Sequence, residues 1–208
     1  MDDPTRTRKD TTHDWGIAVD LGHLARIRRE PATFAPGGVR HLVLEVVAYA
    51  ADEAEASSGG RCLITYCRDG SVSVSDGGRG TAARRDERGR VLRKPVMSTK
   101  DLRFFDSPDA QLLPDGHPRR GISVVAALSE WLVHTNRRQN GAWSQRYEHG
   151  VPVTSLVPVP GNGTTGTTVY FRPDGTVLAD GGHAVIDAVR LAASWPELSV
   201  EIRYEQGS

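Results

Sequence analysis

One long helical segment constrains the fold of this chain more than any other feature. Residues 39–56, VRHLVLEVVAYAADEAEA, combine helical propensity with apolar side chains at helical spacing. Glu45, Tyr49 and Asp52 form a polar stripe, because positions i, i+4 and i+7 fall within roughly 60° of one another on a helix. An apolar stripe lies beside it, made by Leu42, Val43, Val46, Val47 and Ala50. The polar stripe is either a solvated face or a functional one.

Short β-patterned segments surround that helix. RCLITYC and SVSVS are separated by the Asp69-Gly70 pair, which predicts a hairpin. Further strands are predicted in LVHTNRR, WSQRYEH, VPVTSLVPV, TTVYFRP and LSVEIRY, and further helices at 23–30, 121–132 and 183–193. Helices that interleave with a mixed, mostly antiparallel sheet predict an α+β fold, a two-layer α/β sandwich with the helices on one face. We expect a disordered arm at 1–15 and one domain at 16–208.

Composition excludes several classes of protein. The 208 residues include 26 basic and 26 acidic side chains, and zero net charge argues against a protein that holds DNA by bulk electrostatics. The sequence has no run of about 20 apolar residues and no apolar N-terminal segment, so we expect a cytoplasmic protein without membrane spans. The spacing of its histidines and cysteines is not that of a zinc site, so no metal site is predicted.

Two further segments carry candidate functional residues. Asp76 is followed by Gly77-Gly78-Arg79-Gly80, and three glycines after a strand-end carboxylate let backbone approach a ligand closely; alternatively the segment is a simple turn. Residues 82–120 are rich in arginine and show little periodicity, which is typical of a long surface excursion or lid.

The order of these pieces resembles the N-terminal ATPase domain of the B subunit of DNA gyrase and its topoisomerase IV counterpart. That domain belongs to the gyrase, Hsp90, histidine-kinase and mismatch-repair ATPase superfamily. The resemblance covers about residues 21–204 and rests on seven segments in family order: RIRREPATF, GVRHLVLEVVAYAADEA, SVSVSDGGRG, GISVVAALSEWL, QRYEHGVPV, TGTTVYFRP and SVEIRY. It implies a Bergerat-type ATP-binding fold.

The resemblance also implies roles for individual residues. Glu45 matches the general base that activates the attacking water, and Asp52 matches a family acid one turn below. Asp76 matches the aspartate that binds the adenine amino group, and Thr167 matches a threonine that shares a water with it. Other positions match the surroundings of the base: apolar walls at Val46, Val74, Met97, Ile122 and Val169, glycines at Gly78 and Gly80, an arginine near the adenine edge at Arg79, and an arginine that aminocoumarins contact at Arg138.

Two departures from the family pattern concern the phosphates. Tyr49 stands where the family has the asparagine that binds Mg²⁺, and a phenol is a poor Mg²⁺ ligand at neutral pH. The family's glycine-rich phosphate loop reads Gly116-His117-Pro118-Arg119-Arg120-Gly121 here. Arg119 and Arg120 are either replacement ligands for an anion or exposed side chains on the lid.

Three functions follow as hypotheses. We favour a stand-alone, gyrase-B-like protein that binds ATP, ADP or another small molecule through the adenine half, has a degenerate Mg²⁺ and phosphate half, and plays a binding or regulatory role. One alternative is a repurposed enzyme with Glu45, Tyr49 and Asp52 in proton transfer on a small metabolite. The other is an aminocoumarin-binding self-protection protein that uses Asp76 and Arg138. The chain ends after the first family domain, so we expect no DNA cleavage.

Overall fold

The computed structural model describes residues 19–80, 111–178 and 186–205. Its helices are α1 (Leu21–Arg29), α2 (Pro31–Phe34), α3 (Val39–Ser57), α4 (Ile122–Ala127), α5 (Gly175–Leu178) and α6 (Ala188–Ser194). Its strands are β1 (Gly60–Tyr66), β2 (Val72–Asp76), β3 (Ser129–Arg138), β4 (Gly141–Glu148), β5 (Val151–Pro152), β6 (Val157–Pro158), β7 (Gly166–Pro173) and β8 (Leu198–Tyr204). The predicted arm at 1–15, Met97 and residues 82–110 of the predicted lid lie outside these ranges.

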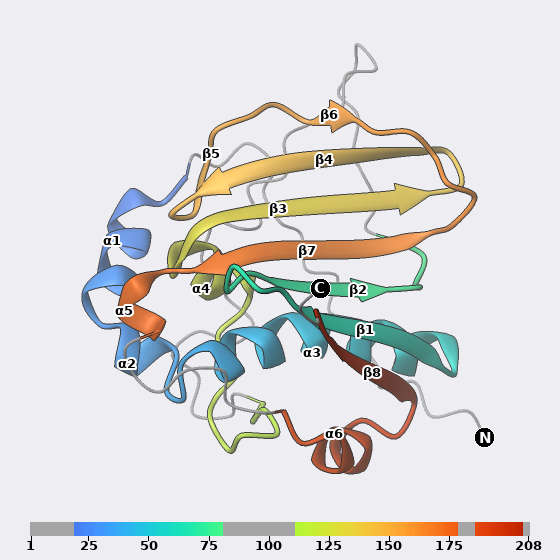
Figure 1. Cartoon of the computed structure of the whole chain (residues 1–208), viewed down its shortest axis with the longest axis horizontal. Coiled ribbons are helices and arrows are strands. Elements are labelled where there is room, and N and C mark those ends of the chain that lie inside the picture. Colours follow the sequence, from blue (N-terminus) through green and yellow to red (C-terminus); the bar gives the residue numbers. More distant parts are fainter. Residues whose placement is uncertain (1–18, 81–110, 179–185, 206–208) are drawn as a thin grey trace, which may run out of the picture.

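The strands form one mixed sheet, which is the second layer of the α+β sandwich expected from the sequence. The strand order is β5-β4-β3-β7-β2-β1-β8, with β6 paired to β4 (Figure 1). Only the β1–β8 pair is parallel among the pairs described. One sheet face buries a continuous row of side chains across the central strands: Ile64, Val74, Val169, His134 and Gln145. Alternate positions face the other side, as strand geometry requires.

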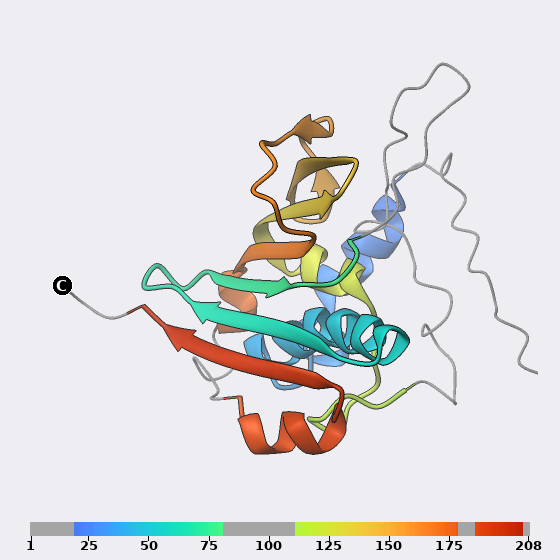
Figure 2. The same ribbon diagram turned by 90° about the vertical axis from the view of Figure 1, so that its right-hand side faces the viewer.

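Helix α3 lies against the sheet and supplies most of the core beneath β1 and β2 (Figure 2). Its apolar stripe is buried as the sequence predicts, with Leu42, Val43 and Val47 at 0% exposure. The helix ends at Ser58, which is left-handed with a φ of 56°, and the backbone N–H of Gly59 closes the last turn on Ala54. The predicted Asp69-Gly70 hairpin joins β1 to β2 in antiparallel register.

Two predicted elements are wrong in extent. The helix expected at 121–132 ends at Ala127, and Ser129 already begins β3, because residues 129–138 pair with both β4 and β7. The strand expected at 151–159 is reduced to β5 and β6. Residues 153–156 lie between these two short strands, and Pro152 and Pro158, which have no N–H to donate to a ladder, limit the pairing of each strand with β4.

The last predicted helix, 183–193, is α6. The structure begins it at Ala188, after Asp187 caps its first turn through the backbone N–H groups of Val189 and Arg190. No helix within the described ranges is long and apolar enough to cross a membrane.

Candidate functional site

The polar stripe of α3 is longer than its sequence pattern first suggests. His41 precedes Glu45 by four residues, so His41, Glu45, Tyr49 and Asp52 share one side of the helix. Each of these four side chains contacts a residue within 111–122. We call residues 111–121 the 111–121 segment. This segment is the described part of the predicted lid together with the first residue after it. The stripe is therefore covered from His41 to Tyr49, and only its last member, Asp52, remains exposed to solvent.

Glu45 is the centre of this contact. Its side chain is 0% exposed, and its two carboxylate oxygens accept hydrogen bonds from the backbone N–H groups of Arg120, at 2.5 Å, and Gly121, at 2.8 Å. These N–H groups immediately precede α4, where a helix has unsatisfied donors that favour an anion. The carboxylate of Glu45 thus satisfies the N–H of the N-cap residue Gly121 and that of Arg120 before it.

His41 lies between two carboxylates. Its Nδ1 is 2.8 Å from Oδ2 of Asp115, and its Nε2 is 3.3 Å from Oε1 of Glu45. Burial opposes the imidazolium, but the hydrogen bonds and charges of Asp115 and Glu45 outweigh it and raise the pKa of His41 to about 9. Burial likewise opposes the Asp115 carboxylate, yet His41 holds the pKa of Asp115 below its usual value. The pair is therefore ionised at neutral pH.

The position of Arg119 rules out one of the two interpretations that the sequence left open for this residue. Its side chain is 0% exposed, so it is not an exposed lid arginine. Its Nη1 and Nη2 donate to the two oxygens of Asp52 at 3.0 and 2.9 Å, and Nη1 also lies 3.1 Å from Oε1 of Gln111. The guanidinium stands 4.6 Å from the ring centroid of Tyr49, whose hydroxyl accepts a hydrogen bond from the N–H of Ile122 at 3.3 Å. The side chain of Arg120 is half-buried.

A second group of predicted residues meets where β2 ends. The carboxylate of Asp76 accepts a hydrogen bond from the N–H of Gly78 at 2.8 Å and another from the backbone of Thr167. Burial is the largest influence on Asp76 and raises its pKa above the usual value, against these two donors. Glycine is needed at Gly78, because a Cβ there would stand 2.6 Å from Cγ of Glu53.

The loop after Asp76 closes against the end of β3. Gly80 has a φ of +72°, and a Cβ there would stand 2.5 Å from the carbonyl oxygen of Arg137. Nη1 of Arg138 donates to the carbonyl oxygen of Gly80 at 3.3 Å. Four of the predicted apolar wall residues are buried in the core: Val46, Val74, Ile122 and Val169.

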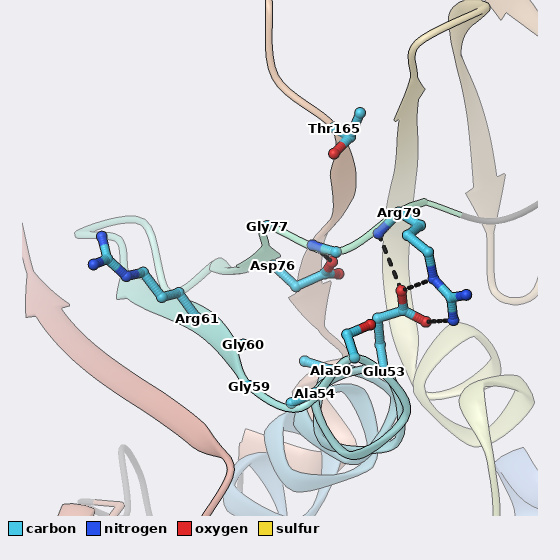
Figure 3. A pocket seen from close by; sticks show the side chains of 12 residues that line it. Ala50, Glu53, Ala54, Gly59, Gly60, Arg61, Asp76, Gly77, Arg79 and Thr165 are labelled. Carbon is cyan, nitrogen blue, oxygen red and sulfur yellow. Dashed lines mark hydrogen bonds and ion pairs between the residues drawn. The ribbon is translucent and has the colours of Figure 1, made fainter.

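A cavity of about 190 Å³ opens beside Asp76 (Figure 3). Its walls come from the last turns of α3, the start of β1, the glycine loop and Thr165. Arg79 closes one side by donating from its backbone N–H, Nε and Nη2 to Glu53, at 3.1, 2.6 and 3.0 Å. Pockets for drug-sized ligands measure roughly 300–1,000 Å³, so this space fits part of such a ligand.

The predicted site residues thus form two groups along α3. One gathers Asp76, Gly78, Gly80, Arg79, Thr167 and Arg138 around the end of β2, and the other gathers Glu45, Tyr49, Asp52, Arg119 and Arg120 around the 111–121 segment. Sequence reasoning missed His41, Glu53, Gln111 and Asp115. His41 had a signal, its spacing of four from Glu45. Asp115 had none, because its partner His41 is far away in the sequence, and Gln111 had none, because its contact with Arg119 depends on the irregular backbone of the 111–121 segment. No group of three potential metal-ligating His, Cys, Asp or Glu side chains occurs among the described residues.

A mixed sheet backed by α3, with a glycine loop after β2, defines a two-layer ATP-binding fold. No protein-family model matches the chain. The B subunit of DNA gyrase from Thermotoga maritima is 35% identical over 161 residues, 73% of this chain and 25% of that protein. The B subunit of DNA topoisomerase 4 from Bacillus subtilis is 32% identical over 164 residues, 76% of this chain and 25% of that protein.

A third relative matches more of the chain. The chloroplastic/mitochondrial DNA gyrase from Nicotiana benthamiana has a B subunit that is 30% identical over 204 residues, 89% of this chain and 28% of that protein. These homologues identify the chain as a gyrase-B-like ATPase-fold domain of the gyrase, Hsp90, histidine-kinase and mismatch-repair superfamily. The chain spans about a quarter of the length of these curated relatives.

Proposed function

We propose that this domain binds an adenine-containing small molecule at the Asp76 end of α3 and does not turn over ATP, so that its role is binding or regulation. The observation that carries the proposal is the burial of Glu45 and the hydrogen bonding of its carboxylate. A general base must reach the attacking water, but Glu45 is fully buried and both of its oxygens accept backbone hydrogen bonds from Arg120 and Gly121. The N–H groups that a phosphate chain would use are the same ones.

The residues near Glu45 do not fit a Mg²⁺ ion. Mg²⁺ requires oxygen ligands in near-octahedral geometry, and a neutral phenol is a poor one. The hydroxyl of Tyr49 accepts from the N–H of Ile122, and both oxygens of Asp52 face the guanidinium of Arg119. Each of these oxygen atoms already accepts from one of the protein's own donors, and the guanidinium of Arg119 places a positive charge against Asp52 and the Tyr49 ring, which disfavours a cation there.

The residues at the other end fit an adenine ring. An ionised carboxylate has about four acceptor positions, and the backbone of Gly78 and Thr167 uses two of those on Asp76. Acceptor capacity thus remains for an exocyclic amino group. The cavity beside Asp76 gives access to its carboxylate and has Ala50 and Ala54 as apolar lining, whereas Val46, Val74 and Val169 are buried in the core behind the site residues and do not line it. We assign base recognition to Asp76 and Thr167, and the close backbone approach to Gly78 and Gly80.

The enzyme alternative receives less support from the same geometry. It needs Glu45 and Tyr49 to face a substrate together, whereas Glu45 is enclosed and Tyr49 packs under Arg119. The drug-binding alternative uses the base site with Arg138, so an aminocoumarin titrated into wild type and Arg138→Ala separates it. Binding that Arg138→Ala weakens would favour that alternative.

The proposal is tested by calorimetric titration with adenosine and by an ATP hydrolysis assay. Asp76→Asn is expected to weaken adenosine binding at least about tenfold, because it replaces an acceptor by an amide. Glu148→Gln is the control, since it also replaces a carboxylate by an amide and Glu148 is exposed on β4, which β3 and β7 separate from β2 in the sheet. We expect ATP hydrolysis at the protein-free background. Turnover that Glu45→Gln abolishes would contradict the proposal, as would adenosine binding unaffected by Asp76→Asn.

A further inference from the structure

Opposite charges, rather than apolar packing alone, hold the 111–121 segment on α3. The segment carries Asp115 and Arg119, and each meets a residue of the opposite charge on the helix, His41 and Asp52 respectively. Those two helix residues stand about three turns apart, roughly 16 Å along the axis. Between them, Glu45 accepts the backbone hydrogen bonds described above. The segment is thus attached at three points along the polar stripe.

The segment is also a small unit of its own. Leu112 and Pro118 form an antiparallel bridge, the N–H of Leu113 donates to the carbonyl of His117, and the N–H of Arg119 donates to the carbonyl of Gln111. Gly121, with a φ of 93°, separates this small hairpin from α4. Such a unit can leave the helix without unravelling itself. Leu113 is its buried apolar anchor.

The attachment at Asp52 is the one that solvent reaches. The side chain of Asp52 is 46% exposed although its partner Arg119 is fully buried, whereas His41 and Asp115 are both enclosed. A pair with one solvated member gains less from its environment than an enclosed pair does. Opening is therefore expected to begin at Arg119 and Asp52.

We propose that the 111–121 segment is an autoinhibitory latch: the Arg119–Asp52 and Asp115–His41 pairs keep it on α3, so that Glu45 takes the place of a polyphosphate at the N–H groups of Arg120 and Gly121. When the latch opens, those N–H groups and the guanidinium of Arg119 become available to an anion. The latch itself does not depend on the adenine site. Only the effect of its opening on ligand binding rests on the proposed function.

Amide hydrogen exchange of the unliganded protein tests the latch directly. In wild type, the N–H groups of Arg120 and Gly121 should exchange at least about 100-fold more slowly than free amides, yet about tenfold faster than those of Val169 and Phe171 in β7, because the latch opens without global unfolding. Asp52→Asn should speed exchange at Arg120 and Gly121 about tenfold further and leave β7 unchanged. Glu148→Gln, a change of an exposed carboxylate on β4, should change neither. The latch would be overturned if the N–H groups of Arg120 and Gly121 were unprotected in wild type, or if they exchanged as slowly in Asp52→Asn as in wild type.

Asp115→Asn is a second, nearly isosteric variant that breaks the other pair. It should also speed exchange at Arg120 and Gly121, so the test does not depend on how well Asp52→Asn folds. If neither variant changes these two amides relative to β7, the two pairs do not hold the segment.

The ligand consequence is tested with inorganic tripolyphosphate, which contains no adenine. Asp52→Asn keeps Arg119 and removes its charged partner, so tripolyphosphate should bind this variant at least about tenfold more tightly than it binds wild type or the control Glu148→Gln. If the N–H groups of Arg120 and Gly121 exchange faster in Asp52→Asn but tripolyphosphate binds no more tightly, the inhibitory role is overturned. The proposal for the adenine site is not affected by that outcome. Failure of adenosine to bind would contradict the proposed function but not the latch.

Discussion

The two ends of α3 are built by different physics. At the Asp76 end, backbone and glycine dominate: the carboxylate is held by main-chain donors, Gly78 and Gly80 allow close approach, and a cavity remains. At the 111–121 end, charged side chains dominate and the contact is closed. A fold of this kind can therefore leave a cavity at one end of α3 while its own charged side chains close the contact at the other end.

The largest effect on stability is expected in the glycine loop at the Asp76 end. Gly80→Ala is expected to cost at least about 3 kcal/mol of unfolding free energy, because alanine is strained at a φ of +72° and its Cβ would stand 2.5 Å from a backbone oxygen. Gly163→Ala is the matched control: its φ is +78°, but nothing lies within 4 Å of the added Cβ. It should cost only about 1 kcal/mol. Urea unfolding measures both, and equal costs would show that the close approach to β3 has no energetic weight.

The second prediction concerns the pH dependence of the 111–121 contact. The pKa of His41 is raised from 6.5 to about 9 by Asp115 and Glu45, with the His117 ring 6.1 Å away. A raised pKa stabilises the folded state fully below about pH 6.5, and this contribution is lost as the pH rises through about 9. The contribution is of order 3 kcal/mol.

Wild type and His41→Asn separate this effect from other titrations. The difference between their unfolding free energies should be largest near pH 6 and should shrink by about 3 kcal/mol near pH 10. Urea unfolding across that range measures it. A difference that stays constant with pH would mean that His41 is not charged in the folded protein.

A smaller effect is expected at the edge of the same contact. Gln111 accepts from Nη1 of Arg119 at 3.1 Å but is itself exposed. Gln111→Ala should therefore cost about 1 kcal/mol, less than a fully buried bond to a charged group. Thermal unfolding is a suitable measurement. A loss as large as that of Gly80→Ala would place Gln111 among the main supports of the segment.

The smallest effect on stability is expected for the pair at the rim of the cavity. Arg79 is 64% exposed, and solvent-exposed pairs contribute little even when they are well formed. Arg79→Gln should leave the urea midpoint unchanged and should alter only ligand access to the cavity. A clear drop in the midpoint would show that the Arg79–Glu53 pair supports the glycine loop.

The sequence predicts the local parts of this molecule well. The periodicity of α3, the Asp69-Gly70 hairpin and the strand TTVYFRP are local patterns, and the structure confirms each. The end of α4 could not be predicted in this way, because pairing of β3 with β4 and β7 overrides the helical pattern after Ala127. The burial of Arg119 depends on Asp52, which is distant in the sequence, so no local signal reveals it.

The candidate site follows the same rule. The family resemblance indicated a set of site residues, and the described ones meet in two groups because the fold brings β2, β3, β7 and α3 together. Whether the 111–121 segment covers the polar stripe of α3 depends on long-range contacts of Asp115 and Arg119, which only the structure reveals. His41 was missed although its spacing of four from Glu45 could have revealed a shared helix face.

The effect of Mg²⁺ on ATP binding, relative to adenosine binding, tests most directly whether the protein's own groups fill the phosphate half. If they do, ATP and adenosine should bind wild type within about threefold of one another, and Mg²⁺ should leave that ratio unchanged. ATP binding that exceeds adenosine binding by about tenfold or more, and tightens further with Mg²⁺, would contradict a closed phosphate half.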